Sequence, residues 1–226
     1  MTDLKTAILI FAHSAEQEAI NKPFLHSQSV FQSLNDHTLQ IVQQTQLPYF
    51  VVNETKQVGA TFGARFTNAM QAVFDVGYDA LIVIGNDTPH LTSSLIKTTK
   101  TKLEANKVVV GESHNGGFYL LGIKKTHFKA ESFLELPWQC QQLSRKLSQL
   151  LQLDALDICL LKKLQDINGV DDIKKIVCFF KKVYRWLFHI FLKITFQKGI
   201  CFKHFSLLKT KQLTSTSYNK GSPLFI

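Results

Sequence analysis

The chain of 226 residues contains only four cysteines, with no C-x-x-C pair and no histidine at zinc-ligand spacing from any of them. A disulfide framework and a structural zinc site are therefore disfavoured, and we expect free thiols in a reducing cytosol. No apolar run reaches the roughly 18 uncharged residues that a membrane-spanning helix needs. The apolar run 7–12 follows Asp3 and lacks a small-residue cleavage site, so we do not expect a signal peptide.

Acidic residues are missing from the C-terminal part of the chain. Residues 174–226 hold eleven Lys or Arg and no Asp or Glu, whereas residues 1–173 hold 15 basic and 17 acidic residues. The net charge of +9 therefore comes entirely from the C-terminal part. We divide the chain into a nearly neutral domain, residues 1–173, and a basic, aromatic-rich helical extension, residues 174–226.

Several common catalytic signatures are also absent. The sequence has no P-loop, no Gly-x-Gly-x-x-Gly and no Ser-His-Asp order. Kinase, dehydrogenase and triad-hydrolase interpretations therefore have no support.

Short aliphatic or aromatic runs alternate with helix-like segments in the first part of the chain. The runs lie at 7–12, 49–53, 81–84, 108–111 and 118–123, and most are continuous, as expected of strands covered on both faces. The helix-like segments lie at 29–46, 62–76 and 92–105. This alternation predicts a three-layer α/β domain with a mostly parallel sheet. Ligands of such sheets bind at the carboxyl ends of the strands.

Asp87 lies where one of these buried runs ends, in the stretch LIVIGNDTPH at 81–90. Gly85 permits a tight backbone before it, and Pro89 stops further strand pairing after it. A carboxylate fixed at a strand end is suited to Mg²⁺, which takes few protein ligands and keeps several waters. The alternative is a structural Asp87 that caps the following helix or forms an Asx turn.

Three further features have both a structural and a functional interpretation. The turn Asn115-Gly116-Gly117 either forms a hairpin or lets a ligand approach bare backbone. Arg65 is either a solvated helix residue or a contact to a phosphate or base. Trp138 either belongs to the core or stacks on a sugar or nucleobase.

The ordered set of motifs AILIFA, FGARFTNAM, LIVIGNDTPHL, VVVGESHNGGFYLLGI, LPWQ and DINGVDDI resembles a bacterial family of predicted GT-A-type glycosyltransferases. This family is a domain of unknown function within the nucleotide-diphospho-sugar transferases, and some members are labelled for arsenosugar biosynthesis. The resemblance extends from about residue 5 to about residue 175. It implies a GT-A-like fold and transfer of a glycosyl group from a nucleotide-diphosphate sugar with Mg²⁺ or Mn²⁺. The acceptor is unknown, and a nucleotidylyltransferase or a non-catalytic binding protein of the same fold is the alternative.

The resemblance also implies roles for individual residues. Asp87 matches the position that the family is expected to use for the metal. By the same resemblance, Asp87 and Asn115 are the expected catalytic residues. Asn115 stands where the family commonly has Asp. The residues carried over as substrate-binding are Lys22, Arg65, Gly116, Gly117 and Trp138. The loop 13–24 departs from the family's Gly-containing, Lys-Thr-Arg pattern: it has no glycine and carries Glu16 and Glu18, which leaves Lys22 as its cation.

The closing motif DINGVDDI offers a second metal ligand. By resemblance to nucleotidylyltransferases that share the fold, the amide oxygen of Asn168 would join Asp87 on the metal. The alternative makes Asn168-Gly169 a turn, with Asp171 and Asp172 as the opening charges of the next helix.

The extension contains a predicted helix at 180–194 on which Lys181, Arg185, His189 and Lys193 form a basic stripe. Residues 176–196 could lie on anionic lipid at the inner face of the membrane, or pack on the main sheet or in a homodimer seam. Nucleic acid is not expected as a partner, because the basic residues are not set among base-stacking positions. We expect a cytoplasmic protein.

Overall fold

The computed structural model describes residues 4–179, 183–185, 188–189, 192 and 207–208. The elements follow in the order β1 (Thr6–Phe11), α1 (Ala15–Asn21), α2 (Ser27–Gln43), β2 (Tyr49–Val52), α3 (Phe62–Asp75), β3 (Ala80–Ile84), α4 (Ser93–Glu104), β4 (Val108–Glu112), β5 (Phe118–Lys124), the 3₁₀ turn η1 (Lys125–His127), α5 (Ala130–Leu134), α6 (Leu143–Leu153), β6 (Ile158–Leu160), α7 (Val170–Phe179), β7 (Val183–Tyr184) and β8 (Leu207–Leu208). The five predicted strands and the three predicted helices are confirmed.

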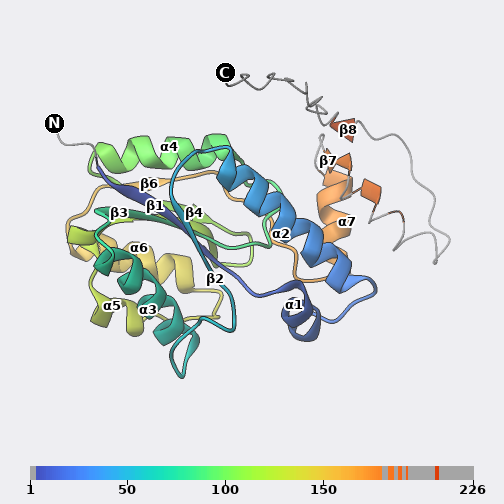
Figure 1. Cartoon of the computed structure of the whole chain (residues 1–226), viewed down its shortest axis with the longest axis horizontal. Coiled ribbons are helices and arrows are strands. Elements are labelled where there is room, and N and C mark those ends of the chain that lie inside the picture. Colours follow the sequence, from blue (N-terminus) through green and yellow to red (C-terminus); the bar gives the residue numbers. More distant parts are fainter. Residues whose placement is uncertain (1–3, 180–182, 186–187, 190–191, 193–206, 209–226) are drawn as a thin grey trace, which may run out of the picture.

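The centre of the molecule is a six-stranded sheet in the order β2-β1-β3-β5-β4-β6. β5 runs antiparallel to both of its neighbours, and the other pairings are parallel. Helices cover both faces, as the aliphatic runs predict (Figure 1). The mostly parallel three-layer α/β architecture is therefore confirmed.

The two faces of the sheet are distinguished by alternate residues of the same strands. Ala7 and Leu9 of β1 pack toward α3, α5 and α6, whereas Ile8 and Ile10 pack toward α2 and α4. All four are buried, because each face of β1 is covered by helices. A continuous apolar run rather than an alternating one is the sequence pattern that such a strand requires.

The chain reverses its direction across the sheet at β1. It passes from β1 through α2 to β2 on one side, and then through α3 to β3 on the other side of β1. Ile10 near the end of β1 lies beside Val51 in β2 and Ile84 in β3, so the carboxyl ends of these strands lie together. A crevice outside such a reversal point is where open α/β sheets bind ligands.

The turn Asn115-Gly116-Gly117 connects the antiparallel strands β4 and β5, so its hairpin interpretation is confirmed. Gly116 has φ +89, and a Cβ atom built on it would lie 1.9 Å from the carbonyl oxygen of Gln141. The Gly116 carbonyl also accepts a hydrogen bond from the Ser144 amide at 3.0 Å. The loop before α6 therefore packs directly against the backbone of Gly116, where a side chain would clash.

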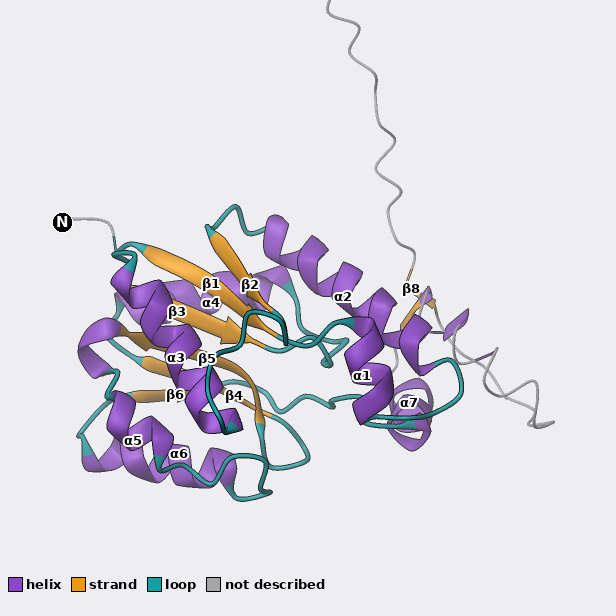
Figure 2. Cartoon of the chain, turned by 60° about the horizontal axis from the view of Figure 1, so that its bottom comes forward, coloured by secondary structure: helices purple, strands orange, loops and turns teal. Residues whose placement is uncertain are grey.

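Helix α7 closes the end of the domain next to α1 and α2 (Figure 2). Ile173, Ile176 and Val177 of α7 are fully buried, and they form one cluster with Val30 and Phe31 of α2. The boundary placed after residue 173 therefore falls inside a helix whose next turn still belongs to the core. The buried positions follow i, i+3 and i+4, which is the spacing of one helix face.

Most of the extension lies outside the described residues, including Lys181, Lys193 and most of 176–196. Within the predicted helix 180–194, the described residues Arg185, Phe188, His189 and Leu192 are helical. Val183 and Tyr184 instead form β7, which pairs with Leu207 and Leu208 of β8. β-branched and aromatic residues favour such pairing once a partner strand is present. Among the described helices, none is long and apolar enough to cross a bilayer.

Replacing Ile176 with alanine should lower the free energy of unfolding by about 2–5 kcal/mol, because it leaves a cavity in the α1–α2–α7 cluster. Urea denaturation of the full chain measures this. Lys175→Ala on the exposed side of the same helix is the control and should cost less than about 1 kcal/mol. Equal effects of the two changes would show that α7 is not part of the core.

Gly116→Ala should destabilise the protein more than Gly77→Ala. Both glycines have positive φ, at +89 and +104, but a Cβ at Gly77 meets nothing within 4 Å. Gly77→Ala therefore carries only the left-handed backbone cost, about 1–2 kcal/mol, whereas Gly116→Ala adds the clash with Gln141. The difference between their urea midpoints isolates that clash, and no difference would contradict the packing of this loop.

Candidate functional site

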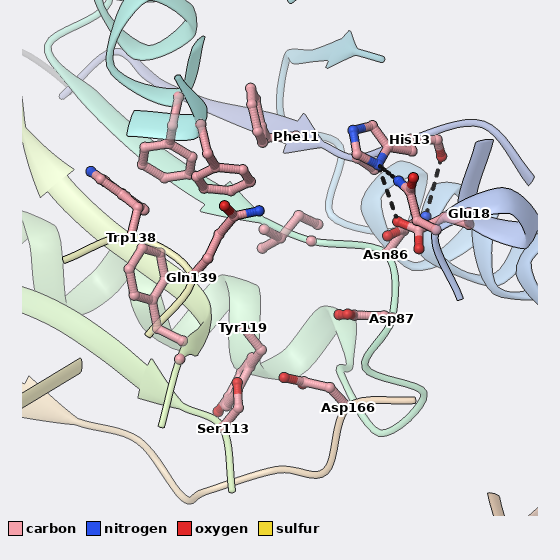
Figure 3. Close-up of a pocket in the computed structure, with 18 of the residues that line it drawn as sticks. Phe11, His13, Glu18, Asn86, Asp87, Ser113, Tyr119, Trp138, Gln139 and Asp166 are labelled. Atoms are coloured by element: carbon pink, nitrogen blue, oxygen red, sulfur yellow. Dashed lines mark hydrogen bonds and ion pairs between the residues drawn. The ribbon is translucent and has the colours of Figure 1, made fainter. Parts of the chain in front are cut away.

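A cavity of about 780 Å³ opens at the reversal point of the sheet (Figure 3). Its walls come from the ends of β1 and β3, from α1, from the start of α3, from the β4–β5 hairpin, and from the segments around residues 138 and 166. Charged side chains gather near α1 and the end of β3, and aromatic side chains gather at α3 and β5. The cavity is thus polar at one end and aromatic at the other.

Asp87 projects into this cavity from the segment after β3 (Figure 3). Its side chain is 24 % exposed, and its Oδ2 atom lies 2.9 Å from Lys22 Nζ. It does not cap the next helix, because α4 is capped by Thr92, whose side chain accepts a hydrogen bond from the Leu95 amide. The carboxylate is therefore held at the cavity wall and reachable from solvent.

Lys22, just after α1, is held between two carboxylates. Its Nζ lies 2.9 Å from Asp87 Oδ2 and 3.3 Å from Glu18 Oε2, and it sits 5.0 Å from the centre of the Phe31 ring. Burial lowers the pKa of Lys22, but the charges of Asp87 and Glu18 more than offset this and raise it above its ordinary value. Lys22 is therefore a cation already neutralised by its neighbours.

Asp166 is the second carboxylate at this end of the cavity, and the sequence analysis did not single it out. It is only 6 % exposed. Its oxygens accept hydrogen bonds from Thr88 Oγ1 at 2.7 Å and from Asn115 Nδ2 at 3.1 Å. Burial, reinforced by the charge of Asp87, raises the pKa of Asp166 to about 7. Protonation of this carboxylate is therefore coupled to the charge of Asp87.

The segment that carries Asp166 is held against the sheet by backbone contacts. Leu164 forms a bridge with Ser113 at the end of β4, and the Ile167 amide donates to the Asp87 carbonyl at 2.8 Å. The buried Ile167 side chain packs into the α1–α2–α7 cluster. These contacts turn the neighbouring Asp166 toward the cavity.

The ends of β1 and β3 are joined by Asn86, which is 4 % exposed. Its Nδ2 atom donates to Asn35 Oδ1 of α2 at 2.7 Å and to the His13 carbonyl at 3.3 Å. His13 in turn lies 3.6 Å from Glu18. This polar chain fixes α1, and with it Lys22, relative to the end of β3.

The remaining predicted residues lie elsewhere along the cavity wall. Arg65 donates through Nε to Gln57 Oε1 at 3.2 Å, and Gly117 lines the cavity beside Asn115. Trp138 packs among aromatic rings, and its Nε1 donates to the Phe133 carbonyl at 2.8 Å. Trp138 is therefore both a packed residue and part of the cavity wall.

The structure brings most of the sequence-predicted residues to one cavity: Lys22, Arg65, Asp87, Asn115, Gly117 and Trp138. Gly116 does not line the cavity, because its open side is occupied by the loop at Gln141. Asn168 is exposed and does not line the cavity either. Its backbone N–H donates a hydrogen bond to Asp172 Oδ2 at 3.0 Å, at the start of α7. The turn interpretation of Asn168 is the one that the geometry favours.

The residues that sequence reasoning missed are Glu18, Asn86 and Asp166. The sequence analysis named Glu18 only as an acidic residue of the altered loop 13–24 and gave it no contact to Lys22, whereas in the structure its Oε2 atom lies 3.3 Å from Lys22 Nζ. Glu16 points away, accepting a hydrogen bond from Gln28 at 3.0 Å. Asp166 lies two residues before Asn168 in the same motif, on the other side of Ile167, and the local sequence carried no signal that distinguished the two.

Asp87 and Asp166 fit a divalent metal ion as two carboxylate ligands. The described residues contain no group of three or more His, Cys, Asp or Glu that could hold an ion by themselves. Mg²⁺ commonly takes one or two carboxylates and completes its shell with water and substrate phosphates. The raised pKa of Asp166 beside Asp87 also reflects two like charges that a cation would stabilise.

The pKa of Asp166 predicts how stability depends on pH without metal. The native carboxyl holds its proton up to about pH 7, whereas the ordinary value is 3.8. Stability from this group is therefore full below about pH 4 and is lost as the pH rises to about 7, by a few kcal/mol at about 1.4 kcal/mol per pKa unit. Urea unfolding in EDTA from pH 4 to 8 should show this fall. Asp166→Asn should flatten it, and the exposed Asp75→Asn should not.

Comparison with solved structures shows which fold this is. A "putative nucleotide-diphospho-sugar transferase" from Desulfovibrio desulfuricans G20 matches with a TM-score of 0.69 and 19 % identity, over 77 % of this chain and 87 % of that one. A 4-diphosphocytidyl-2C-methyl-D-erythritol synthase from Anaerococcus prevotii matches at 0.48 and 13 % identity, over 74 % and 94 %. A Mycobacterium tuberculosis protein solved in complex with manganese matches at 0.46 and 11 % identity, over 76 % and 97 %.

A search of curated proteins finds no match to the chain. A family profile described as "Uncharacterized protein conserved in bacteria (DUF2064)" matches residues 27–139, which is half of the chain and includes Asp87, Asn115 and Trp138. The six-stranded sheet, its flanking helices and the solved structure from Desulfovibrio agree on the fold. The chain belongs to the DUF2064 family and has the fold of the nucleotide-diphospho-sugar transferases.

Proposed function

We propose that the protein is a glycosyltransferase that uses a nucleotide-diphosphate sugar and a Mg²⁺ or Mn²⁺ ion. The observation that carries the proposal is the pair of carboxylates, Asp87 and Asp166, at one end of a cavity of about 780 Å³. That volume lies within the range of small-molecule sites. The cavity also lies where this sheet topology favours ligand binding.

The charges of the cavity support a metal-dependent reaction. Four carboxylates among the described lining residues, Glu18, Glu54, Asp87 and Asp166, face two basic side chains, Lys22 and Arg65. Lys22 is already paired with two of the carboxylates. A diphosphate would be repelled here unless a cation came with it. A bound divalent ion would stabilise the negative charge that gathers on the leaving diphosphate.

The chain's own residues then have separate roles. Asp87 and Asp166 hold the cation, and Asp166 takes the place that the sequence analysis gave to Asn168. Asn115 is a positioning residue, because its amide fixes Asp166 on one side and the Gly117 backbone on the other. Asp87, as a ligand of the cation, would release Lys22, whose charge would then be free to pair with the diphosphate. Arg65, which also lines the cavity, contacts the nucleoside or its phosphates.

Removing either metal-binding carboxylate should weaken nucleotide binding in the presence of Mn²⁺. We expect Asp87→Ala and Asp166→Ala each to lose more than about tenfold in affinity, since even outer partners of metal ligands carry that much. Calorimetry with Mn²⁺ and a panel of nucleoside diphosphates measures this, with the exposed Asp75→Ala as the control. Nucleotide binding that is unchanged by Mn²⁺ and by both substitutions would contradict the metal site.

The product identifies the reaction. A glycosyltransferase releases a nucleoside diphosphate from the nucleotide sugar, whereas a nucleotidylyltransferase consumes a nucleoside triphosphate and releases pyrophosphate. Incubation with each class of nucleotide and separation of the products distinguishes them. Metal-dependent binding without either product would identify a binding protein that retains the fold without turnover.

A further inference from the structure

The aromatic end of the cavity is formed by Phe62 and Phe66 of α3, Phe118 of β5, and Trp138. The Trp138 ring centre lies 4.7 Å from that of Phe66, 5.4 Å from Phe62 and 6.0 Å from Phe118. Phe62, Phe118 and Trp138 are only half-buried, so part of this wall faces the cavity. A purely structural aromatic cluster would have no need to leave these rings open.

The wall is rigid. Trp138 is anchored by the hydrogen bond from its Nε1 to the Phe133 carbonyl. It also rests on Gly63, where a Cβ would lie 2.4 Å from the Trp138 ring, so α3 carries a glycine at the contact point. A surface whose side chains are fixed in advance binds a ligand with little loss of conformational entropy.

The rings do not present one flat face. Trp138 is inclined to Phe62 and Phe66 by 45° and 44°, and to Phe118 by 67°. A nucleobase stacks best on the flat face of a single ring. Phe62 and Phe66 lie within 17° of parallel, and Trp138 is inclined to both, so the wall is angled rather than flat. An angled apolar wall instead fits the puckered, CH-bearing face of a saturated sugar ring. The electron-rich faces of aromatic rings attract such positively polarised groups.

Gln139 adds a polar group to this surface. Its side chain is exposed and projects into the cavity beside the aromatic residues (Figure 3). The residue has φ +62, in the left-handed region that glycine and asparagine favour over glutamine. An amide has both a donor and an acceptor for sugar hydroxyls.

We propose that the aromatic end of the cavity, formed by Phe62, Phe118, Trp138 and Gln139, is a subsite for the pyranose ring of a sugar. The proposal rests on the proposed function, since it assigns the second half of the same cavity. The inclined rings contact the apolar face of the sugar, and the Gln139 amide binds its hydroxyl groups. Either the transferred sugar or an acceptor sugar has this chemistry.

Sugar binding is tested without metal or nucleotide, so that it does not depend on the metal-binding end. The chain has two tryptophans, and Trp186→Phe leaves Trp138 as the fluorescent reporter. Titration with a panel of methyl pyranosides should give a saturable change in emission, and Asp87→Ala in the same background should retain it. Uridine, cytidine, adenosine and guanosine serve as the base-bearing comparison. Failure of metal-dependent nucleotide binding with retained pyranoside binding would refute the proposed function alone.

Gln139→Gly separates binding from structure. Glycine relieves the left-handed strain, so the urea midpoint should rise, while pyranoside affinity should fall about three- to tenfold with the lost amide contacts. Gln142→Gly is the matched control, because Gln142 is an exposed glutamine of the same loop that does not line the cavity. It should leave pyranoside binding unchanged. A purely structural Gln139 would show the stability gain with no loss of binding.

The source of the sugar is resolved by adding the donor. An acceptor sugar should still bind when an intact nucleotide sugar and Mn²⁺ occupy the cavity, whereas a subsite for the transferred sugar should be blocked by them. Either result supports the proposal. Nucleosides that change Trp138 emission more strongly than every pyranoside, or pyranosides that produce no change at all, would overturn it.

Discussion

The site depends on the placement of Lys22 between Glu18 and Asp87. This one side chain ties α1 to the end of β3, and the charges of Asp87 and Glu18 raise its pKa above the ordinary value although burial lowers it. Glu18 and Asp87 neutralise the charge of Lys22, so Asp166 lies beside Asp87 without a cation of its own. In the proposed function, this end of the cavity would attract a positive ion, and an anionic ligand would bind only together with that ion. Because the attraction is electrostatic and partly shielded from water, it exceeds that of surface charges.

The fold was largely predictable from the sequence because its strands are covered on both faces. Runs such as 81–84 are apolar at every position, and β3 is buried at every position. The three long helices, α2, α3 and α4, were found as helix-like segments between the strand-like runs. β6 was missed because it has only three residues, and α7 was divided because the change in charge after residue 173 precedes the last buried residues, Ile176 and Val177. Composition follows the solvent-exposed surface, whereas the end of a domain is set by burial.

The site was predictable only where chemistry follows directly from a strand end. Asp87 and Asn115 stand at such positions, and both line the cavity. Asp166 was not found because its segment reaches the site through contacts between distant parts of the chain, the bridge of Leu164 to Ser113 and the bond of Ile167 to Asp87. In the local sequence, Asn168 and Asp166 are equally suited to be the second metal ligand. The burial of Ile167 between them does not distinguish the two. Gly116 was misjudged for a related reason, since its neighbour is the distant loop at Gln141.

The departures from the family pattern form a consistent set. Asn115 stands where the family commonly has Asp, yet an ionised Asp there would face Asp166 with a like charge and could not donate a hydrogen bond. Asn115 instead donates to Asp166 Oδ2 and accepts from the Gly117 amide. In the same way, Glu18 in the altered loop holds Lys22 in place. One acidic residue is exchanged for an amide and another is paired with a buried lysine, so the charges of the cavity are rearranged rather than lost. The two neighbouring carboxylates, Asp87 and Asp166, therefore still line the wall of an open cavity.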